Sequence, residues 1–122
     1  MKKGIFLFSL LLLANSAIAS TWSRTYSEAN RYSSAYTVGP TADGGYFAAG
    51  SSYTSPNDAA SSDIILMKID ASGDVQWRKT YGGSDQDNAN STIQTSDGGF
   101  LIAGSTKSFG AGIDDFWLLK LD

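Results

Sequence analysis

Two copies of an Asp-Gly-Gly turn, each followed by small and apolar residues, constrain the fold of this 122-residue chain more than any other feature. The first copy runs from Asp43 to Ser51 and the second from Asp97 to Ser105. Glycine supplies the positive φ that a tight hairpin turn needs, and aspartate can bond its own backbone two residues on. Each copy therefore predicts a β-hairpin, and its small residues predict close approach by another strand or sheet.

Two further motifs recur in the same order along the chain. Trp22–Tyr26 matches Trp77–Tyr81 in its Trp, basic, Thr and Tyr positions, and Asp63–Asp70 matches Asp115–Asp122. In the second pair one strand face is apolar throughout, at Ile65, Met67, Ile69 and their mates Trp117, Leu119, Leu121. The alternation predicts strands that are buried on this face throughout and on the other face only at their start.

These motifs predict an all-β fold of two four-stranded antiparallel units. Repeat 1 covers about 34–81, and repeat 2 covers about 89–122 together with the strand 22–26. Since repeat 2 has no Trp-bearing fourth strand of its own, our hypothesis is that Trp22–Tyr26 completes its sheet. Pro40 cannot donate a ladder hydrogen bond, so we expect the first strand of repeat 1 to be bulged or cut short there.

The motif set D-[IF]-[IW]-L-[ML]-K-[IL]-D, S-G-D-V-Q-W-R-K-T-Y-G-G-S and T-S-D-G-G-F-L-I-A-G-S resembles the repeats of secreted bacterial and archaeal β-propeller-like proteins. The resemblance covers nearly all of residues 21–122 and implies an architecture and export, not one activity. Two blades cannot close a ring of about four to eight. Three outcomes stay open: copies of the chain that close a ring together, a two-sheet sandwich, and a truncated piece of a longer propeller.

The N-terminus has the pattern of a signal peptide over residues 1–19. Lys2 and Lys3 precede an apolar run from Gly4 to Ala14, and Ala17-Ile18-Ala19 has the form of a cleavage site. The run is too short for a spanning helix, which needs about 20 residues. We therefore expect residues 20–122 to be secreted or periplasmic, without a membrane anchor after cleavage. No cysteine is available for lipid attachment or disulfides.

Composition argues against several functions. Twelve acidic residues face nine basic ones, two of which lie in the signal segment, so neither nucleic acid nor an anionic membrane surface is an expected partner. Histidine and cysteine are absent, which removes a common general base, metal ligand and nucleophile. We expect no enzyme activity, and we assign no catalytic, cofactor-binding or metal-binding residue.

Two groups of side chains still suggest sites. Asp85, Asp87 and Asn88 could supply oxygen ligands to calcium, although an Asx-rich loop that bonds its own backbone also explains them and is favoured. Asp114 and Asp115 are expected to be turn and strand-start residues. The aromatic residues outside the repeated strands either form a surface for sugar or peptide recognition or cap the ends of the sheets; they are Tyr32, Tyr36, Tyr53 and Phe109.

The sequence thus predicts a non-catalytic secreted β-repeat module for binding or for a structural surface role. Its partners would be a carbohydrate, a protein or further copies of itself. The alternative is a fragment or subunit of a larger propeller, including an enzyme whose site is absent from this chain alone. A degenerate gene product without present function is the third interpretation.

Overall fold

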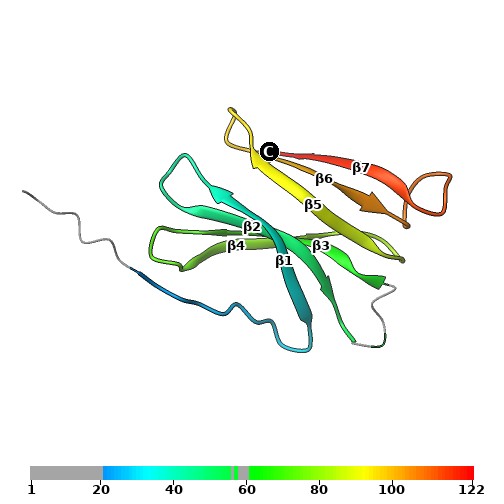
Figure 1. The fold of residues 1–122 in the computed structure, drawn as a ribbon, viewed down its shortest axis with the longest axis horizontal. Coiled ribbons are helices and arrows are strands. Elements are labelled where there is room, and N and C mark those ends of the chain that lie inside the picture. The colour runs from blue at the N-terminus through cyan, green and yellow to red at the C-terminus, as the bar shows by residue number, and fades with distance from the viewer. Residues whose placement is uncertain (1–20, 56, 58–60) are drawn as a thin grey trace, which may run out of the picture.

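The computed structural model describes residues 21–55, 57 and 61–122, which form two antiparallel sheets (Figure 1). The first sheet has the strand order β1-β2-β3-β4, with β1 at Tyr32–Pro40, β2 at Tyr46–Tyr53, β3 at Asp63–Ile69 and β4 at Val75–Tyr81. The second has the order β5-β6-β7, with β5 at Asp87–Gln94, β6 at Phe100–Thr106 and β7 at Asp115–Leu121. The predicted all-β fold of two antiparallel units is confirmed. The predicted signal peptide, residues 1–19, lies outside the described residues.

The two units, which we equate with the two sheets, repeat each other in register as well as in sequence. Ala49 lies opposite Leu66 in the first unit, as Ala103 lies opposite Leu118 in the second. The first two strands of each unit also carry a register shift at the same place, between Ala35 and Thr37 and between Ala89 and Ser91. Positions can therefore be compared one by one between the units.

The shared bulge corrects the expectation about Pro40. β1 runs through Pro40, which is paired with Tyr46, and its irregularity lies at Tyr36 instead. β1 is an edge strand with a neighbour on one side only, and Pro40 is its last residue. A proline at the end of an edge strand removes no hydrogen bond that the ladder needs, so the strand is not cut short there.

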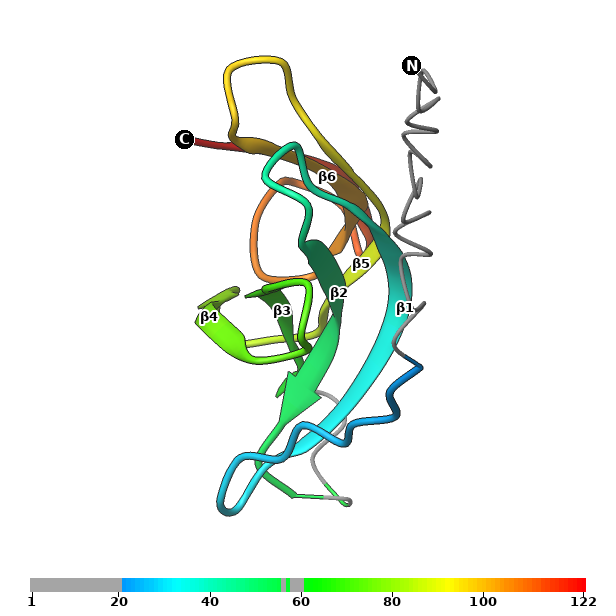
Figure 2. The same ribbon diagram turned by 90° about the vertical axis from the view of Figure 1, so that its left-hand side faces the viewer.

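The core lies between the two sheets. Figure 2 shows the second sheet stacked across one face of the first, and β5 contacts β1, β2 and β3. The buried apolar cluster draws on both sheets and consists of Phe47, Ala49, Ile64, Leu66, Ala89, Phe100 and Ile102. The ring of Phe100 meets Phe47 and Trp77 edge to face, with centroids 5.5 and 5.7 Å apart. Such pairs stabilise a core beyond the area that they bury.

Burial of β3 differs from the prediction. Ile64 and Leu66 face the second sheet and are buried, whereas Ile65 and Met67 lie half-buried on the opposite face. Both faces of this strand are apolar at its start, so alternation alone could not decide which one meets the neighbouring sheet. In β7 the predicted apolar face does point toward the first sheet, but it is only half-buried.

The N-terminal segment also departs from the hypothesis, because Trp22–Tyr26 does not join the second sheet. It is extended without ladder pairing and lies against the turn between β3 and β4 of the first unit. Its three alternate side chains donate to successive carbonyls there: Trp22 Nε1 to Ala71 (3.2 Å), the Arg24 guanidinium to Ser72 (3.3 Å) and the Tyr26 hydroxyl to Gly73 (2.8 Å). The side chains of the segment alternate as predicted, but those on one side contact a turn and not a neighbouring strand.

Candidate functional site

The two Asp-Gly-Gly motifs form the same closed turn. Thr41 N–H donates to the Gly45 carbonyl at 2.9 Å, and Thr95 N–H donates to the Gly99 carbonyl at the same distance. In each turn the aspartate Oδ1 accepts from the threonine hydroxyl and from the second glycine N–H. The first glycine has a φ of 86° or 85°. These carboxylates are therefore used to hold a hairpin.

A lysine from the unit's third strand completes each turn. Lys68 Nζ pairs with Asp43, and Lys120 Nζ lies 2.8 Å from Asp97 Oδ2. The Lys68 ammonium, with the Thr41 hydroxyl and the Gly45 N–H, holds the pKa of Asp43 well below its usual range. The equivalent groups lower the pKa of Asp97, and Asp97 in turn raises the pKa of Lys120.

These depressed pKa values predict a loss of stability in acid. An aspartate in an unfolded chain has a pKa of about 3.9. As the pH falls, the carboxylates of Asp43 and Asp97 are therefore protonated in the unfolded state before they are protonated in the native state, and the native state loses stability from about pH 5 downward. In the double variant Asp43→Asn and Asp97→Asn, we expect a lower melting temperature at neutral pH and a shallower fall toward about pH 2. Thermal melts followed by circular dichroism test this. The control is Asp114→Asn in an exposed loop position, and an equal acid slope in the double variant and the wild type would contradict it.

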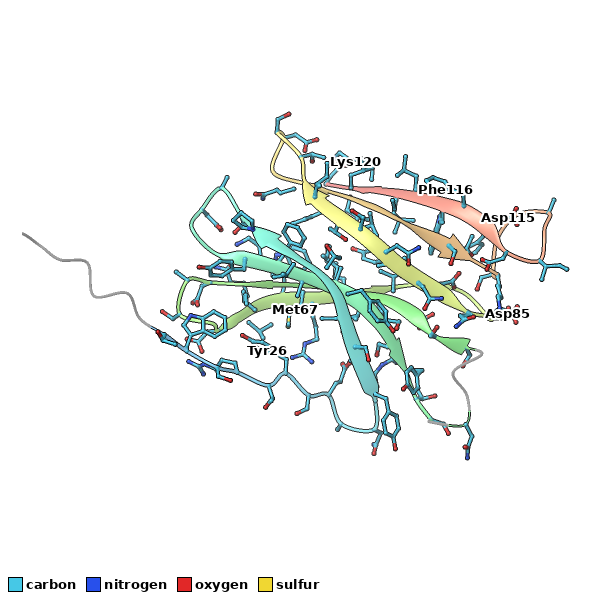
Figure 3. All side chains as sticks on the ribbon, viewed as in Figure 1. Tyr26, Met67, Asp85, Asp115, Phe116 and Lys120 are labelled. Carbon is cyan, nitrogen blue, oxygen red and sulfur yellow. The ribbon has the colours of Figure 1, made fainter. Side chains whose placement is uncertain are left out.

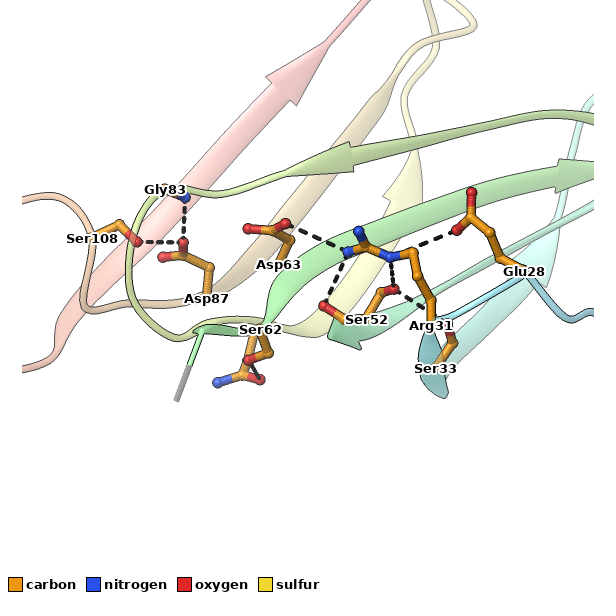
Figure 4. A network of polar contacts seen from close by, with 10 residues as sticks. Glu28, Arg31, Ser33, Ser52, Ser62, Asp63, Gly83, Asp87 and Ser108 are labelled. Atoms are coloured by element: carbon orange, nitrogen blue, oxygen red, sulfur yellow. Dashed lines mark hydrogen bonds and ion pairs between the residues drawn. The ribbon is translucent and has the colours of Figure 1, made fainter. Parts of the chain in front are cut away.

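Asp87 and Asn88, which were predicted to lie in a loop, are the first two residues of β5 and use their side-chain oxygens within the chain (Figure 4). Asp87 is fully buried and accepts from Gly83 N–H at 2.8 Å, from Ser108 Oγ at 2.6 Å and from Thr106 Oγ1. Asn88 instead accepts from Ser62, 3.4 Å away. Across residues 21–55, 57 and 61–122 no group of three or more His, Cys, Asp or Glu side chains is arranged to hold a metal ion.

The other candidate acids have similar local partners. Asp85 accepts from the Ser84 hydroxyl at 3.2 Å, and its own N–H donates to Ser108 Oγ at 3.0 Å. Asp115 Oδ2 accepts from Gly112 N–H at 2.9 Å, which is a turn contact of the kind predicted. Asp85 lies in the loop between β4 and β5, whereas Asp115 is the first residue of β7, and the two carboxylates accept from different donors, so they do not form one centre.

An arginine cluster was not predicted from the sequence. Arg31 Nε donates to Ser52 Oγ at 2.8 Å, and its guanidinium lies 3.6 Å from Asp63 and 3.7 Å from Glu28 (Figure 4). The members come from the segment before β1, from β2 and from β3, so no local motif marks them. The cluster joins the N-terminal segment to the first sheet.

Three of the four predicted aromatic residues come together on one face of the first sheet; we call Tyr32, Tyr36 and Tyr53 the tyrosine patch. Tyr32 and Tyr53 are cross-strand partners and stack with centroids 5.5 Å apart and an interplanar angle of 13°. Tyr36 occupies the bulge, and its hydroxyl oxygen accepts from Ser51 Oγ at 3.2 Å. Tyr32 is 48% and Tyr36 59% exposed, so the rings remain accessible.

Phe109 lies elsewhere, at the outer end of the second unit. Its ring is 5.3 Å from that of Trp117, and both line an open groove of about 400 Å³ between the end of β4 and the inner face of β7. Tyr81 and Leu119 also line it. In the part of the chain that the structure describes, β7 pairs with β6 on one side and has no strand on the other.

Comparison with known proteins gives no family for this chain, since no protein-family model and no curated protein matches it. In the part of the chain that the structure describes, no helix has the length and apolar character needed to cross a bilayer.

Proposed function

We propose that this chain is a non-catalytic exported β-repeat module that binds carbohydrate through the tyrosine patch. The observation that carries the proposal is the convergence of three tyrosines on one sheet face, two of them 48% and 59% exposed. Sugar rings offer apolar C–H faces and hydroxyl rims, which suit flat aromatic rings that carry polar tips. The rigid sheet fixes the patch before a ligand arrives, which limits the entropy lost on binding.

The absence of a catalytic role is supported by how the acids are used. Asp43 and Asp97 hold turns, Asp87 is buried among donors, and Asp70 Oδ1 accepts from the backbone of Ser72 and Asp74 in the β3–β4 turn. Glycoside hydrolysis needs two carboxyl groups about 5 to 10 Å apart across a sugar site. Two carboxylates near the start of β1, Glu28 and Asp63, are both paired with the Arg31 guanidinium, at 3.7 and 3.6 Å.

A glycan array followed by calorimetry tests this function. For a glycan that binds, we expect Tyr36→Ala and Tyr32→Ala each to weaken affinity about tenfold, or about 1.4 kcal/mol, because each removes an exposed ring. Tyr36→Phe keeps the ring and should retain most of the affinity. Phe109→Ala, which removes an exposed ring outside the patch, is the matched control. An array without a hit, or equal losses in Phe109→Ala, would count against the proposal.

A second candidate function is that of a subunit or piece of a larger propeller. This includes a propeller enzyme whose active site forms only in the complete ring. It is favoured by the second sheet, in which β7 is paired on one side only. Further in-frame repeats downstream of Asp122 in the gene would support this candidate.

A further inference from the structure

The second unit exposes the residues that the first unit buries between the sheets. Ile64 and Leu66 of β3 are 1% and 0% exposed against the second sheet. Their equivalents in β7, Phe116 and Leu118, are 80% and 55% exposed. Figure 3 shows Phe116 on the side of β7 that faces away from the first sheet, and Leu118, two residues on, shares that side of the strand. We call this surface the second outer face; it comprises Ile93, Leu101, Ala103, Phe116 and Leu118.

The first unit shows the converse arrangement. The second unit meets the core with Phe100 and Ile102 of β6 and with Trp117 and Leu119 of β7. The equivalent side chains of the first unit lie on the side away from the second sheet and form the first outer face: Tyr46, Ala48, Ile65 and Met67. This face borders a pocket of about 220 Å³. The second outer face is thus equivalent to the face that the first unit presents to the core, and the first outer face is equivalent to the face that the second unit presents to it.

We propose that a second copy of this chain docks head to tail, with its first outer face on the second outer face of its neighbour. The contact would repeat the existing one between the two units, position for position. Such an interface is heterologous, since two different patches meet, and successive copies either close a ring or extend a filament.

Lys120 is paired across the strands with Leu101 and so adjoins the second outer face, and its environment is compatible with burial. Lys68 lies at the existing contact with its side chain 11% exposed, and it is paired with Asp43. Its equivalent Lys120 has a side chain that is 40% exposed and already bonded to Asp97. A paired ammonium can be buried at a moderate cost, whereas an unpaired one cannot. Docking would therefore leave no uncompensated charge at Lys120.

The N-terminal segment has to move for this docking, and the repeat indicates where it goes. Tyr26 borders the pocket beside Met67, and Trp22 lies 6.2 Å from the ring of Tyr46, so the segment covers part of the first outer face (Figure 3). In sequence, Trp22–Tyr26 is equivalent to β4, which pairs with β3. In the head-to-tail pair, this segment of the second copy arrives at the free edge of β7 and can add to it as a strand.

Sedimentation velocity on the purified protein tests the proposal, from about 1 μM to about 1 mM, where weak interfaces dissociate. We expect the mass to rise above that of a monomer with concentration. The double variant Phe116→Ser and Leu118→Ser should lose this association. Ile113→Ser, which changes a 91% exposed residue outside the face, should keep it. A wild type that stays monomeric throughout, or a double variant that still associates, would overturn the proposal.

Mixing two blocked variants separates head-to-tail docking from symmetric pairing. Phe116→Asp blocks one face and Met67→Lys blocks the other, so each variant alone should be monomeric. Their mixture retains one intact pair of faces and should give a dimer that does not grow further. Circular dichroism melts establish that both variants are folded. If folded variants fail to combine, or if association proceeds through two equal faces, the head-to-tail interface is wrong. Neither result depends on whether a glycan binds the tyrosine patch.

Discussion

Replacing Leu66 with alanine is expected to lower the free energy of unfolding by about 2 to 5 kcal/mol, the range for truncating a fully buried leucine. Leu66 is 0% exposed and lies in the cluster between the two sheets. The loss combines the transfer free energy of the removed methyl groups with the cavity left between Ala49 and the second sheet. Against a typical total of about 5 to 15 kcal/mol, such a change would remove a large fraction of the stability.

The chain itself supplies the matched control in Leu118→Ala. Leu118 occupies the same position in the second unit, opposite Ala103 as Leu66 is opposite Ala49, but it is 55% exposed. We expect its truncation to change the stability of the monomer by no more than about 0.5 kcal/mol. Urea denaturation at low protein concentration measures both variants. Equal losses would show that the two units do not stack as the structure has them.

The local features of the fold could be predicted because each rests on a short motif with one geometric solution. Asp43-Gly44-Gly45 and Asp97-Gly98-Gly99 both close hairpins, and their recurrence sets the order of strands in both units. The small residues after these turns predicted a close approach. The structure confirms it at Gly50, where an added Cβ would overlap the carbonyl oxygen of Ser34.

What could not be predicted depends on how the units meet. Ile64, Ile65, Leu66 and Met67 are all apolar, so alternation gives two usable faces and only the position of the second sheet decides between them. The N-terminal segment could pair with the edge of β7 or contact the turn at Ala71–Gly73. In the structure its side chains donate hydrogen bonds to the carbonyls of this turn.

The sequence predicted the tyrosine patch but not the Arg31 cluster. Tyr32 and Tyr53 follow from strand pairing, since they are direct cross-strand partners. Tyr36 lies four residues after Tyr32, so strand alternation places the two side chains on one face, and the Tyr36 hydroxyl accepts from Ser51. The Arg31 cluster combines three segments distant in sequence, and charge alone gave no reason to select its members.

The second large effect is expected from Gly104→Ala. A Cβ at Gly104 would overlap the carbonyl oxygen of Asn88 and lie 3.0 Å from its carbonyl carbon, and these are backbone atoms of the bulged strand β5. A side-chain end could rotate away, but this backbone can yield only by breaking the ladder next to the bulge at Asn90. We expect a loss of about 3 kcal/mol, at the upper end of the range for overpacking, in urea denaturation.

Gly98→Ala separates this steric effect from backbone strain. Gly98 has a φ of 85°, and apart from the glycine and its chain neighbours nothing lies within 4 Å of the place that an added methyl group would take. Its substitution therefore costs only the left-handed conformation, about 1 kcal/mol. Gly50→Ala is expected to match Gly104→Ala, because a Cβ at Gly50 would meet the Ser34 carbonyl in the same way. If Gly104→Ala were no more destabilising than Gly98→Ala, the bulge would not be pressed against the glycine strand. Equal and large losses in Gly50→Ala and Gly104→Ala would show that both units depend on the same close contact between backbone atoms of neighbouring strands.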